Sequence, residues 1–166
     1  GAHLKKCCME LGGKDPLIVC EDADMERATA AASFGSFMHQ GQICMSVEKI
    51  LVHENIYDEF LAKFVERASK LKVGPPLANK ENIIGPLIND KQVENVRAQL
   101  DDAFAKGAKA VLGGNINGRF VDPTILIGVT PDMTVYQDET FGPVAPVIPY
   151  RTDEEAIAIA NDSPYG

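Results

Sequence analysis

The sequence predicts an α/β fold, with a mostly parallel sheet flanked by helices. Short apolar runs alternate along the whole chain with stretches whose apolar residues recur at helical spacing, and this alternation is typical of parallel strands joined by helical crossovers. No internal repeat or low-complexity stretch interrupts the alternation. With 166 residues the chain is long enough to enclose one hydrophobic core, so residues 1–166 are expected to form a single domain.

The chain is expected to begin with a strand and a helix. A buried strand is predicted over residues 14–20, where a short apolar run is bounded by proline and charged residues. An Ala-rich helix is predicted up to Gln40, because Asp22 or Asp24 can cap its start and Gly41 can end it. The apolar residues at helical spacing in this helix are Ala31, Phe34 and Met38.

Two further helices are predicted after a second strand over residues 49–52. The first of them opens at Asn55 and stops before the Gly-Pro-Pro of residues 74–76, because proline cannot continue a helix. Its apolar face consists of Ile56, Phe60, Phe64 and Leu71. The second runs over residues 90–106 and is closed by Gly107.

The last third of the chain is predicted to hold three extended segments and one helix. A strand is expected over residues 110–112, and residues 120–127 are extended, with a proline that marks an edge or a bend. A further apolar run over residues 144–150 predicts another strand. A last helix follows, which Asp153 caps and which extends through Ala160.

Charge and composition narrow the classes of partner. The formal net charge is −8 at pH 7, which argues against a nucleic acid or an anionic membrane as a general partner. No apolar run approaches the roughly 18 residues that a membrane span needs, and no signal-peptide pattern is present. A local basic pocket for a phosphate-bearing cofactor is compatible with this overall charge.

The cysteine and histidine pattern predicts free thiols and no metal site. The four cysteines show no paired Cys-x-x-Cys spacing, and the three histidines are scattered. Free thiols indicate a reducing, cytoplasmic setting. Cys7, Cys8 and Cys20 lie in or beside apolar, strand-like runs, so they are interpreted as buried structural thiols.

Cys44 and Glu10 are the candidates for chemistry. Cys44 follows Gly41, just past the predicted helix, where a thiol can be exposed while its backbone is held; the alternative is a buried structural thiol. Glu10 has apolar neighbours and precedes two glycines, which allow a ligand to approach the backbone closely. Apolar neighbours favour a carboxylate that acts as a general base, and the alternative is a solvated glutamate at a strand end.

Three segments, in this order along the chain, resemble signatures of the aldehyde dehydrogenase superfamily. Residues 9–14, Met-Glu-Leu-Gly-Gly-Lys, match its Glu-Leu-Gly-Gly-Lys motif, and residues 41–44, Gly-Gln-Ile-Cys, match its cysteine motif. Residues 138–144 resemble its Glu-x-Phe-Gly-Pro cofactor motif, and residues 85–88 and 120–124 are weaker matches. The spacing between the glutamate and the cysteine also fits the family, so the resemblance covers essentially the whole chain.

The resemblance implies an NAD(P)-dependent oxidation of an aldehyde to a carboxylic acid, on a catalytic domain of Rossmann-like type. Cys44 would be the nucleophile that forms a thiohemiacetal and then a thioester, and its backbone N–H would help to hold the oxyanion. Glu10 would activate the water that hydrolyses the thioester. The cofactor contacts that the resemblance implies are Leu11, Gly12, Glu139 and Phe141. Glu139 would bind hydroxyls of the nicotinamide ribose, Phe141 would pack near the nicotinamide, and NAD is expected rather than NADP.

The same resemblance raises expectations about the substrate and the rest of the enzyme. Residues 37–46 look most similar to members that oxidise aromatic aldehydes such as benzaldehyde, salicylaldehyde or vanillin. The chain is expected to be a catalytic fragment of a homodimeric or homotetrameric parent, without the cofactor domain and the oligomerisation segment, and to have negligible activity alone. Pro75 stands in a surface turn where relatives often carry Asp.

Two alternatives stay open at this point. CoA-acylating relatives pass the acyl group to CoA, and many of them do not use the glutamate as a base, so the presence of Glu10 favours hydrolysis. A non-catalytic protein that keeps the fold as a structural or interaction module is an alternative from another class. The presence of Cys44, Glu10 and Glu139 argues against such a module for the parent protein.

Overall fold

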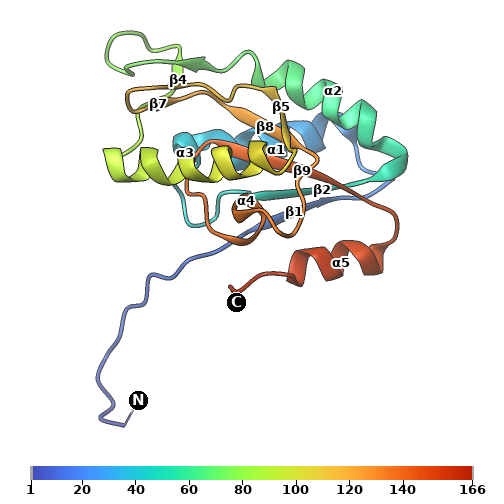
Figure 1. Ribbon diagram of the computed structural model, residues 1–166, viewed down its shortest axis with the longest axis horizontal. Coiled ribbons are helices and arrows are strands. Elements are labelled where there is room, and N and C mark those ends of the chain that lie inside the picture. Colours follow the sequence, from blue (N-terminus) through green and yellow to red (C-terminus); the bar gives the residue numbers. More distant parts are fainter. Residues whose placement is uncertain (1, 166) are drawn as a thin grey trace.

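The fold is built around a central sheet (Figure 1). A computed structural model describes residues 2–165 of the chain. Within these residues the central sheet has five strands in the order β1-β2-β9-β8-β5. Their bounds are Pro16–Val19 for β1, Lys49–His53 for β2, Lys109–Leu112 for β5, Thr124–Ile127 for β8 and Val144–Tyr150 for β9. The pairs β1–β2, β2–β9 and β9–β8 are parallel, and only β5 runs antiparallel to its neighbour. The predicted mostly parallel sheet is therefore confirmed.

Helices cover both faces of this sheet. The helices α1, Met25–Phe37, and α2, Tyr57–Ala68, pack on one face, and α3, Asp90–Ala105, packs on the other together with α4, Thr134–Gln137, and α5, Asp153–Asn161. Figure 1 shows α2 and α5 on opposite sides of the strands. The result is a three-layer arrangement in which the sheet is buried from both sides, as a parallel sheet requires.

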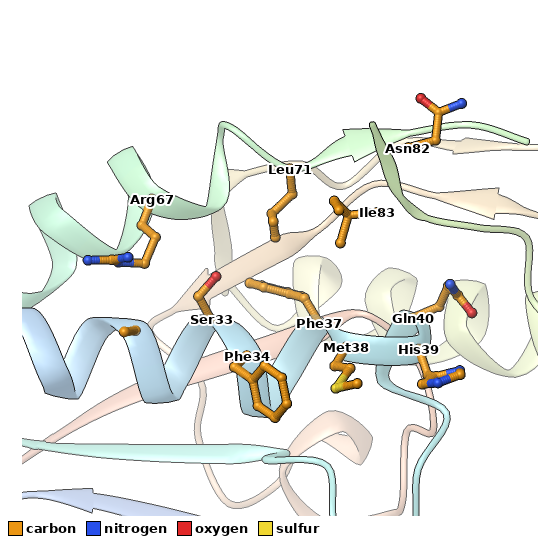
Figure 2. Close-up of a pocket in the computed structure, with 11 residues that line it drawn as sticks. Ser33, Phe34, Phe37, Met38, His39, Gln40, Arg67, Leu71, Asn82 and Ile83 are labelled. Atoms are coloured by element: carbon orange, nitrogen blue, oxygen red, sulfur yellow. The ribbon is translucent and has the colours of Figure 1, made fainter. Parts of the chain in front are cut away.

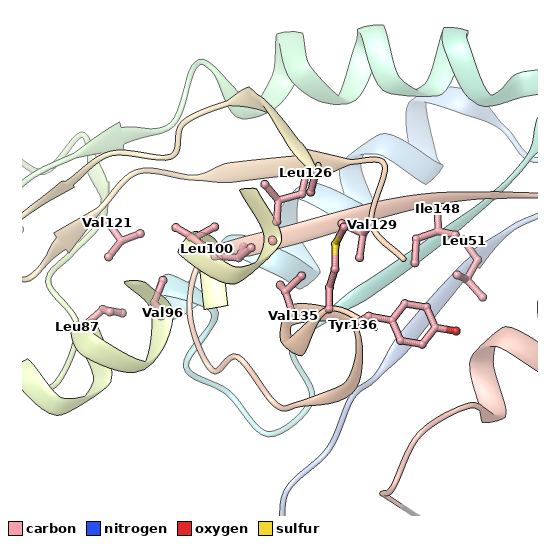
Figure 3. Close-up of a cluster of buried hydrophobic side chains, with 14 of the residues drawn as sticks. Leu51, Leu87, Val96, Leu100, Val121, Leu126, Val129, Val135, Tyr136 and Ile148 are labelled. Atoms are coloured by element: carbon pink, nitrogen blue, oxygen red, sulfur yellow. The ribbon is translucent and has the colours of Figure 1, made fainter. Parts of the chain in front are cut away.

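Alternation along the strands divides the core into two clusters. In β2, Ile50 and Val52 belong to the cluster under α1 and α2, whereas Leu51 belongs to the cluster under α3, α4 and α5. Figure 3 shows the second cluster, in which Leu100 from α3 and Leu126 from β8 lie close to each other. All of these side chains are at most 2% exposed, because successive residues of a strand point to opposite faces and both faces are covered.

The first helix begins as predicted but buries a different face. Asp24 accepts from the backbone N–H of Arg27 and so caps α1. The apolar residues that fall at helical spacing, Ala31, Phe34 and Met38, are exposed. The buried positions of α1 are Thr29, Ala32, Ser33, Ser36 and Phe37. Small side chains let the helix pack closely: a Cβ on Gly35 would come within 2.7 Å of the Val47 side chain.

The boundaries of the other helices differ from the predictions by short segments. A 3₁₀ turn, Glu54–Ile56, precedes α2, which ends at Ala68, so Leu71 lies outside the helix. Thr152, and not Asp153, caps α5 by accepting from the N–H of Glu155. Serine, threonine, asparagine and aspartate all serve as caps, so the sequence alone could not separate two adjacent candidates.

Several short elements were not predicted. The strands β3, Lys72–Val73, and β4, Asn82–Ile84, form a parallel pair, and β6, Ile116–Asn117, pairs with β7, Phe120–Val121. A 3₁₀ turn, Met38–Gly41, follows α1. The predicted extended segment 120–127 is divided into β7 and β8 by Asp122 and Pro123. None of the helices within residues 2–165 is both long enough and apolar enough to cross a bilayer.

The cysteines Cys7, Cys8 and Cys20 are exposed and unbridged, so their interpretation as buried thiols was wrong. Cys20 follows β1, which is one of the two edge strands of the sheet and has a neighbour on one side only among the described residues. Cys7 and Cys8 belong to an N-terminal segment that runs away from the body of the domain (Figure 1). Apolar neighbours in the sequence therefore do not imply burial here, because nothing in residues 2–165 covers this segment.

Candidate active site

The three motif segments meet at the amino ends of three neighbouring parallel strands. Residues 12–14 precede β1, residues 44–48 precede β2, and residues 139–143 precede β9. Because β2 lies between β1 and β9, segments that are far apart in the sequence become neighbours in space. Ligands of open α/β sheets usually bind at the carboxyl ends of the strands. This site lies instead at the amino ends of the strands, at the other end of the sheet.

Cys44 lies in a tight turn whose backbone is well held. The N–H of Ser46 donates to the carbonyl of Ile43 at 2.9 Å, which places Cys44 within the turn, and its thiol is exposed. Before the turn, the left-handed Gly41 packs directly on the backbone of Gly142. The arrangement agrees with an exposed thiol on a fixed backbone and excludes a buried structural thiol.

Glu10 is exposed in the extended segment before β1, and its carboxylate forms no hydrogen bond with Cys44 or with any other group within residues 2–165. Its chain is anchored three residues further on, where the N–H of Gly13 donates to Oε1 of Glu139 at 3.1 Å. Gly13 in turn lies against the backbone of Cys44. Three residues of extended chain span about 10 Å, so Glu10 is tethered near the thiol without touching it.

Glu139 is half-buried beside the two glycines, and each of its polar groups except Oε2 has a partner. Oε1 accepts from Gly13, the backbone N–H donates to the hydroxyl of Tyr165 at 3.1 Å, and the carbonyl accepts from Nε2 of Gln99 at 3.0 Å. A Cβ on Gly12 would collide with the Tyr165 ring and lie 3.4 Å from Oε2. The absence of a side chain at residue 12 therefore lets the Tyr165 ring lie against the Gly12 backbone, next to this carboxylate.

Phe141 is half-buried and adopts a left-handed backbone with φ 50°, which is unusual for an aromatic residue. Its N–H donates to Oε1 of Glu48 at 2.8 Å, and its carbonyl accepts from Nε2 of Gln92 at 3.0 Å. Leu11, the remaining predicted cofactor contact, is 75% exposed. The structure thus brings Gly12, Glu139 and Phe141 to the same end of the sheet as Cys44, and it leaves Leu11 open to solvent.

A buried ion pair that the sequence reasoning missed connects the three motifs. Nζ of Lys14 lies 2.9 Å from Oε2 of Glu48, and the two side chains are 0% and 5% exposed. Nζ of Lys14 also donates to Oγ1 of Thr140 at 3.0 Å. Burial lowers the pKa of Lys14, and the adjacent Glu48 carboxylate opposes that shift. Charged residues of opposite sign just ahead of the two apolar strands, Lys14 before β1 and Glu48 before β2, were the signal that could have revealed the pair.

Amide side chains from α3 support the same loop, and two of them, Asn95 and Gln99, were missed by the sequence reasoning. Nε2 of Gln92 donates to the carbonyl of Thr140 at 2.8 Å, Nδ2 of Asn95 donates to the same carbonyl at 3.1 Å, and Oε1 of Gln99 accepts from Oγ1 of Thr140 at 2.7 Å. Residues 92, 95 and 99 share one face of a helix. Three amide side chains at this spacing were a readable sign that α3 holds a polar partner.

Lys49 fixes the segment that carries Tyr165. Its side chain is buried, and Nζ donates to the carbonyls of Asp162 at 3.2 Å and Ile159 at 3.4 Å, at the end of α5. Nζ also lies 3.9 Å from the centre of the Tyr136 ring, a geometry that stabilises a cation. Burial lowers the pKa of Lys49. The lysine thus links β2 to the chain end whose tyrosine contacts Glu139.

A large apolar groove lies apart from this site. It has a volume of about 590 Å³ and lies between α1, the end of α2 and β4, with Phe34, Met38, Leu71 and Ile83 in its wall (Figure 2). Apolar hollows of this size are the usual first candidates for ligand sites. Neither Cys44 nor Glu139 lines the groove, so the residues that could do chemistry lie elsewhere. Within residues 2–165, no group of three or more metal-ligating side chains gathers.

The fold and the site define an α/β protein in which an exposed loop thiol and a carboxylate-bearing loop meet at the amino ends of parallel strands. The family model described as "Aldehyde dehydrogenase family" matches residues 1–166. The chain therefore belongs to the aldehyde dehydrogenase family, as its motifs predicted.

Named relatives agree with this assignment. The chain is 51% identical over 164 residues to salicylaldehyde dehydrogenase of Pseudomonas putida, covering 99% of the chain and 34% of that protein. It is 43% identical over 166 residues to benzaldehyde dehydrogenase [NAD(+)] of Pseudomonas putida, covering 100% of the chain and 34% of the relative. The crystal structure of a salicylaldehyde dehydrogenase from Pseudomonas putida G7 complexed with salicylaldehyde superimposes with a TM-score of 0.93 at 51% identity, over 99% of the chain and 34% of that structure. The chain thus spans about a third of these proteins.

Proposed function

We propose that the chain forms the catalytic part of an NAD(P)-dependent aldehyde dehydrogenase that oxidises an aldehyde to a carboxylic acid. The observation that carries the proposal is the exposed thiol of Cys44 on a turn packed, through Gly41, against the loop that bears Glu139. Because the chain spans about a third of its relatives, residues 1–166 are proposed as one catalytic unit that acts together with the remaining parts of such an enzyme.

Cys44 is proposed as the nucleophile. Its thiolate attacks the aldehyde carbon and forms a thiohemiacetal, which becomes a thioester when hydride is lost. The backbone N–H of Cys44 forms no hydrogen bond to another backbone group within residues 2–165, so it can donate to the developing oxyanion. The turn at Ser46 fixes the direction of this N–H before substrate arrives.

Glu10 is proposed as the base that activates water for hydrolysis of the thioester. Its exposed carboxylate is tethered to the Cys44 region through Gly13, so a movement of the extended segment can bring it to the acyl carbon. Transfer of the acyl group to CoA is the competing outcome. The product, free acid or acyl-CoA, distinguishes the two acceptors.

The residues at the amino ends of β1, β2 and β9 suit a nicotinamide cofactor. Oε1 of Glu139 accepts from Gly13, whereas Oε2 is unpartnered within residues 2–165, and a free carboxylate oxygen suits the hydroxyls of a ribose. Glu139 and Phe141, with Gly12 and Leu11, are the residues proposed to hold the cofactor. When bound, NAD or NADP accepts the hydride. We propose NAD as the first cofactor to test and NADP as the second, since the names of relatives 43% and 42% identical to the chain carry NAD(+) and NADP(+) respectively.

The proposed substrates are aromatic aldehydes, with salicylaldehyde first. Support comes from the 51% identity to salicylaldehyde dehydrogenase and from the solved structure of such an enzyme with salicylaldehyde. A homodimeric or homotetrameric parent enzyme is proposed from the membership of the chain in the aldehyde dehydrogenase family. A reducing, cytoplasmic setting is proposed from the four unbridged and exposed thiols.

A hybrid enzyme tests the proposal: salicylaldehyde dehydrogenase of Pseudomonas putida whose matching third is replaced by this chain. NADH formation from salicylaldehyde is expected in the hybrid enzyme, and Cys44→Ser should lower its rate by at least about a thousandfold, because hydroxyl nucleophiles without an activating base are weak. Cys20→Ser, at another exposed thiol, is the matched control and should retain the rate. Equal activity in Cys44→Ser and the hybrid enzyme would overturn the assignment.

A further inference from the structure

We propose that the buried pair Lys14 and Glu48 is a positioning device that sets the cofactor loop, residues 139–141, relative to the turn that carries Cys44. The inference rests on the proposed function, since it takes Glu139 as the residue that binds the nicotinamide ribose. Neither residue of the pair is exposed enough to touch a ligand, so both are positioning residues.

Glu48 gives both carboxylate oxygens to the cofactor loop and to Lys14. Oε2 accepts from Nζ of Lys14 at 2.9 Å and from the N–H of Thr140 at 2.7 Å, and Oε1 accepts from the N–H of Phe141 at 2.8 Å. Hydrogen bonds to a charged, buried acceptor are among the strong ones. Glu48 lies only four residues after Cys44. Its carboxylate therefore ties the turn of residues 43–46, here called the thiol turn, to two consecutive amides of the cofactor loop.

Lys14 completes the device from a third strand. Its ammonium group neutralises Glu48 and also donates to Oγ1 of Thr140. Lys14 follows directly on the segment that binds Glu139 through the N–H of Gly13. The pair therefore couples the amino ends of β1 and β2 to the loop before β9, so that one buried contact joins all three motifs.

The conformation of Phe141 explains why the loop needs such a device. A left-handed backbone is strained for an aromatic residue and persists only where its surroundings fix it. Glu48 holds the N–H groups of Thr140 and Phe141, and Gln92 holds both of their carbonyls. Without Glu48, the amides lose their acceptors and the loop is free to relax to an ordinary backbone, which would shift Glu139 away from its place beside Gly12.

Stability alone does not require an ion pair here. Replacing a buried ion pair by apolar side chains of similar volume is often neutral for stability, whereas removing one partner is costly. The double variant Lys14→Met/Glu48→Leu therefore separates the two roles. It removes the buried charges together and is therefore expected to keep the fold, yet it leaves Thr140 and Phe141 without the carboxylate that positions them.

The experiment compares wild type, Glu48→Gln and Lys14→Met/Glu48→Leu, with Glu66→Gln as control because Glu66 forms an exposed pair with Lys70. In the full chain, hydrogen exchange at the amides of Thr140 and Phe141 should become at least about tenfold faster in both pair variants, as expected when hydrogen bonds are lost. Exchange in α2 and β9 should stay unchanged, and the control should match wild type throughout.

Cofactor affinity in the hybrid enzyme gives the second readout. The Kd for NAD, measured directly without aldehyde, should rise about tenfold in both pair variants, while alkylation of Cys44 by iodoacetamide stays within about twofold of wild type. Recovery of both Tm and NAD affinity in the double variant would show a merely structural pair and overturn the inference, as would unchanged exchange at Thr140 and Phe141. Failure of the unmutated hybrid enzyme to bind NAD would instead contradict the proposed function, and the exchange data would still decide the positioning role.

Discussion

Gly41 lies so close to Gly142 that a Cβ on Gly41 would overlap the carbonyl oxygen of Gly142. One glycine belongs to the motif of Cys44 and the other to the motif of Glu139. Contact between the two backbones brings the thiol turn and the cofactor loop together, and no other residue type allows it.

Substitution of this contact should disturb the site and the fold together. Gly41 has φ +68°, so Gly41→Ala carries the cost of a left-handed alanine, about 1–2 kcal/mol, and in addition displaces the Gly142 backbone. Gly118 has φ +57° with nothing within 4 Å of an added Cβ, so Gly118→Ala isolates the backbone cost. Urea unfolding should show a clearly larger loss of unfolding free energy for Gly41→Ala than for Gly118→Ala. Equal losses in the two variants would mean that the contact with Gly142 is unimportant.

Removal of Lys14 alone should be strongly destabilising. Lys14→Met leaves Glu48 as an unpaired buried charge, and breaking a buried pair in this way typically costs about 3–5 kcal/mol of unfolding free energy. Lys70→Met breaks an exposed pair with Glu66 at 2.7 Å and should cost at most about 0.5 kcal/mol. Chemical denaturation of both variants measures the difference, and similar losses would speak against an energetically important buried pair.

Asp102 should contribute stability that disappears in acid. Its hydrogen bond with Lys106, supported by Thr134, lowers the pKa of this carboxyl from 3.8 to about 2. Because the folded-state pKa lies below the unfolded value, the contribution is complete above about pH 4 and is lost as the pH falls through about 2. The stability difference between wild type and Asp102→Asn, measured by thermal unfolding, should therefore shrink over this range. A difference that stays constant down to pH 2 would contradict the assignment.

All four cysteines should react in the native chain. Cys7, Cys8, Cys20 and Cys44 are exposed and free, so iodoacetamide should modify the same set of thiols in buffer as in urea. Peptide mass mapping identifies the modified residues. Protection of Cys7, Cys8 or Cys20 in buffer alone would show that the N-terminal segment or the β1 edge is covered in solution.

The overall fold was predictable because hydrophobic periodicity is a local property. Alternating apolar runs revealed β2 and β9, and the spacing of apolar residues revealed α2 and α3. The buried face of α1 could not be predicted, because it includes Ala32 and Ser36, and small residues at a close packing contact carry little hydrophobic signal. Burial of Cys20 was predicted wrongly because it depends on which strand forms the edge, and strand order is not a local property.

The candidate site was predictable only as far as its motifs extend. Cys44 and Glu139 lie in recognisable segments, and the structure brings these segments together. The partnership of Lys14 with Glu48 depends on β1 and β2 being neighbours in register, which no spacing along the chain encodes. The same holds for Gln92 and Gln99, whose partners lie at least 40 residues away.

The covalent intermediate gives the most direct test of the central claim that Cys44 is the nucleophile and Glu10 the base. In the hybrid enzyme, Glu10→Gln should still form the thioester but hydrolyse it slowly, since water lacks its base. The variant is mixed with NAD and salicylaldehyde and quenched in acid. Peptide mass spectrometry should then find the salicyloyl (2-hydroxybenzoyl) group on the Cys44 peptide. NADH formation without an acyl adduct on Cys44, or with the adduct on another cysteine, would contradict the account.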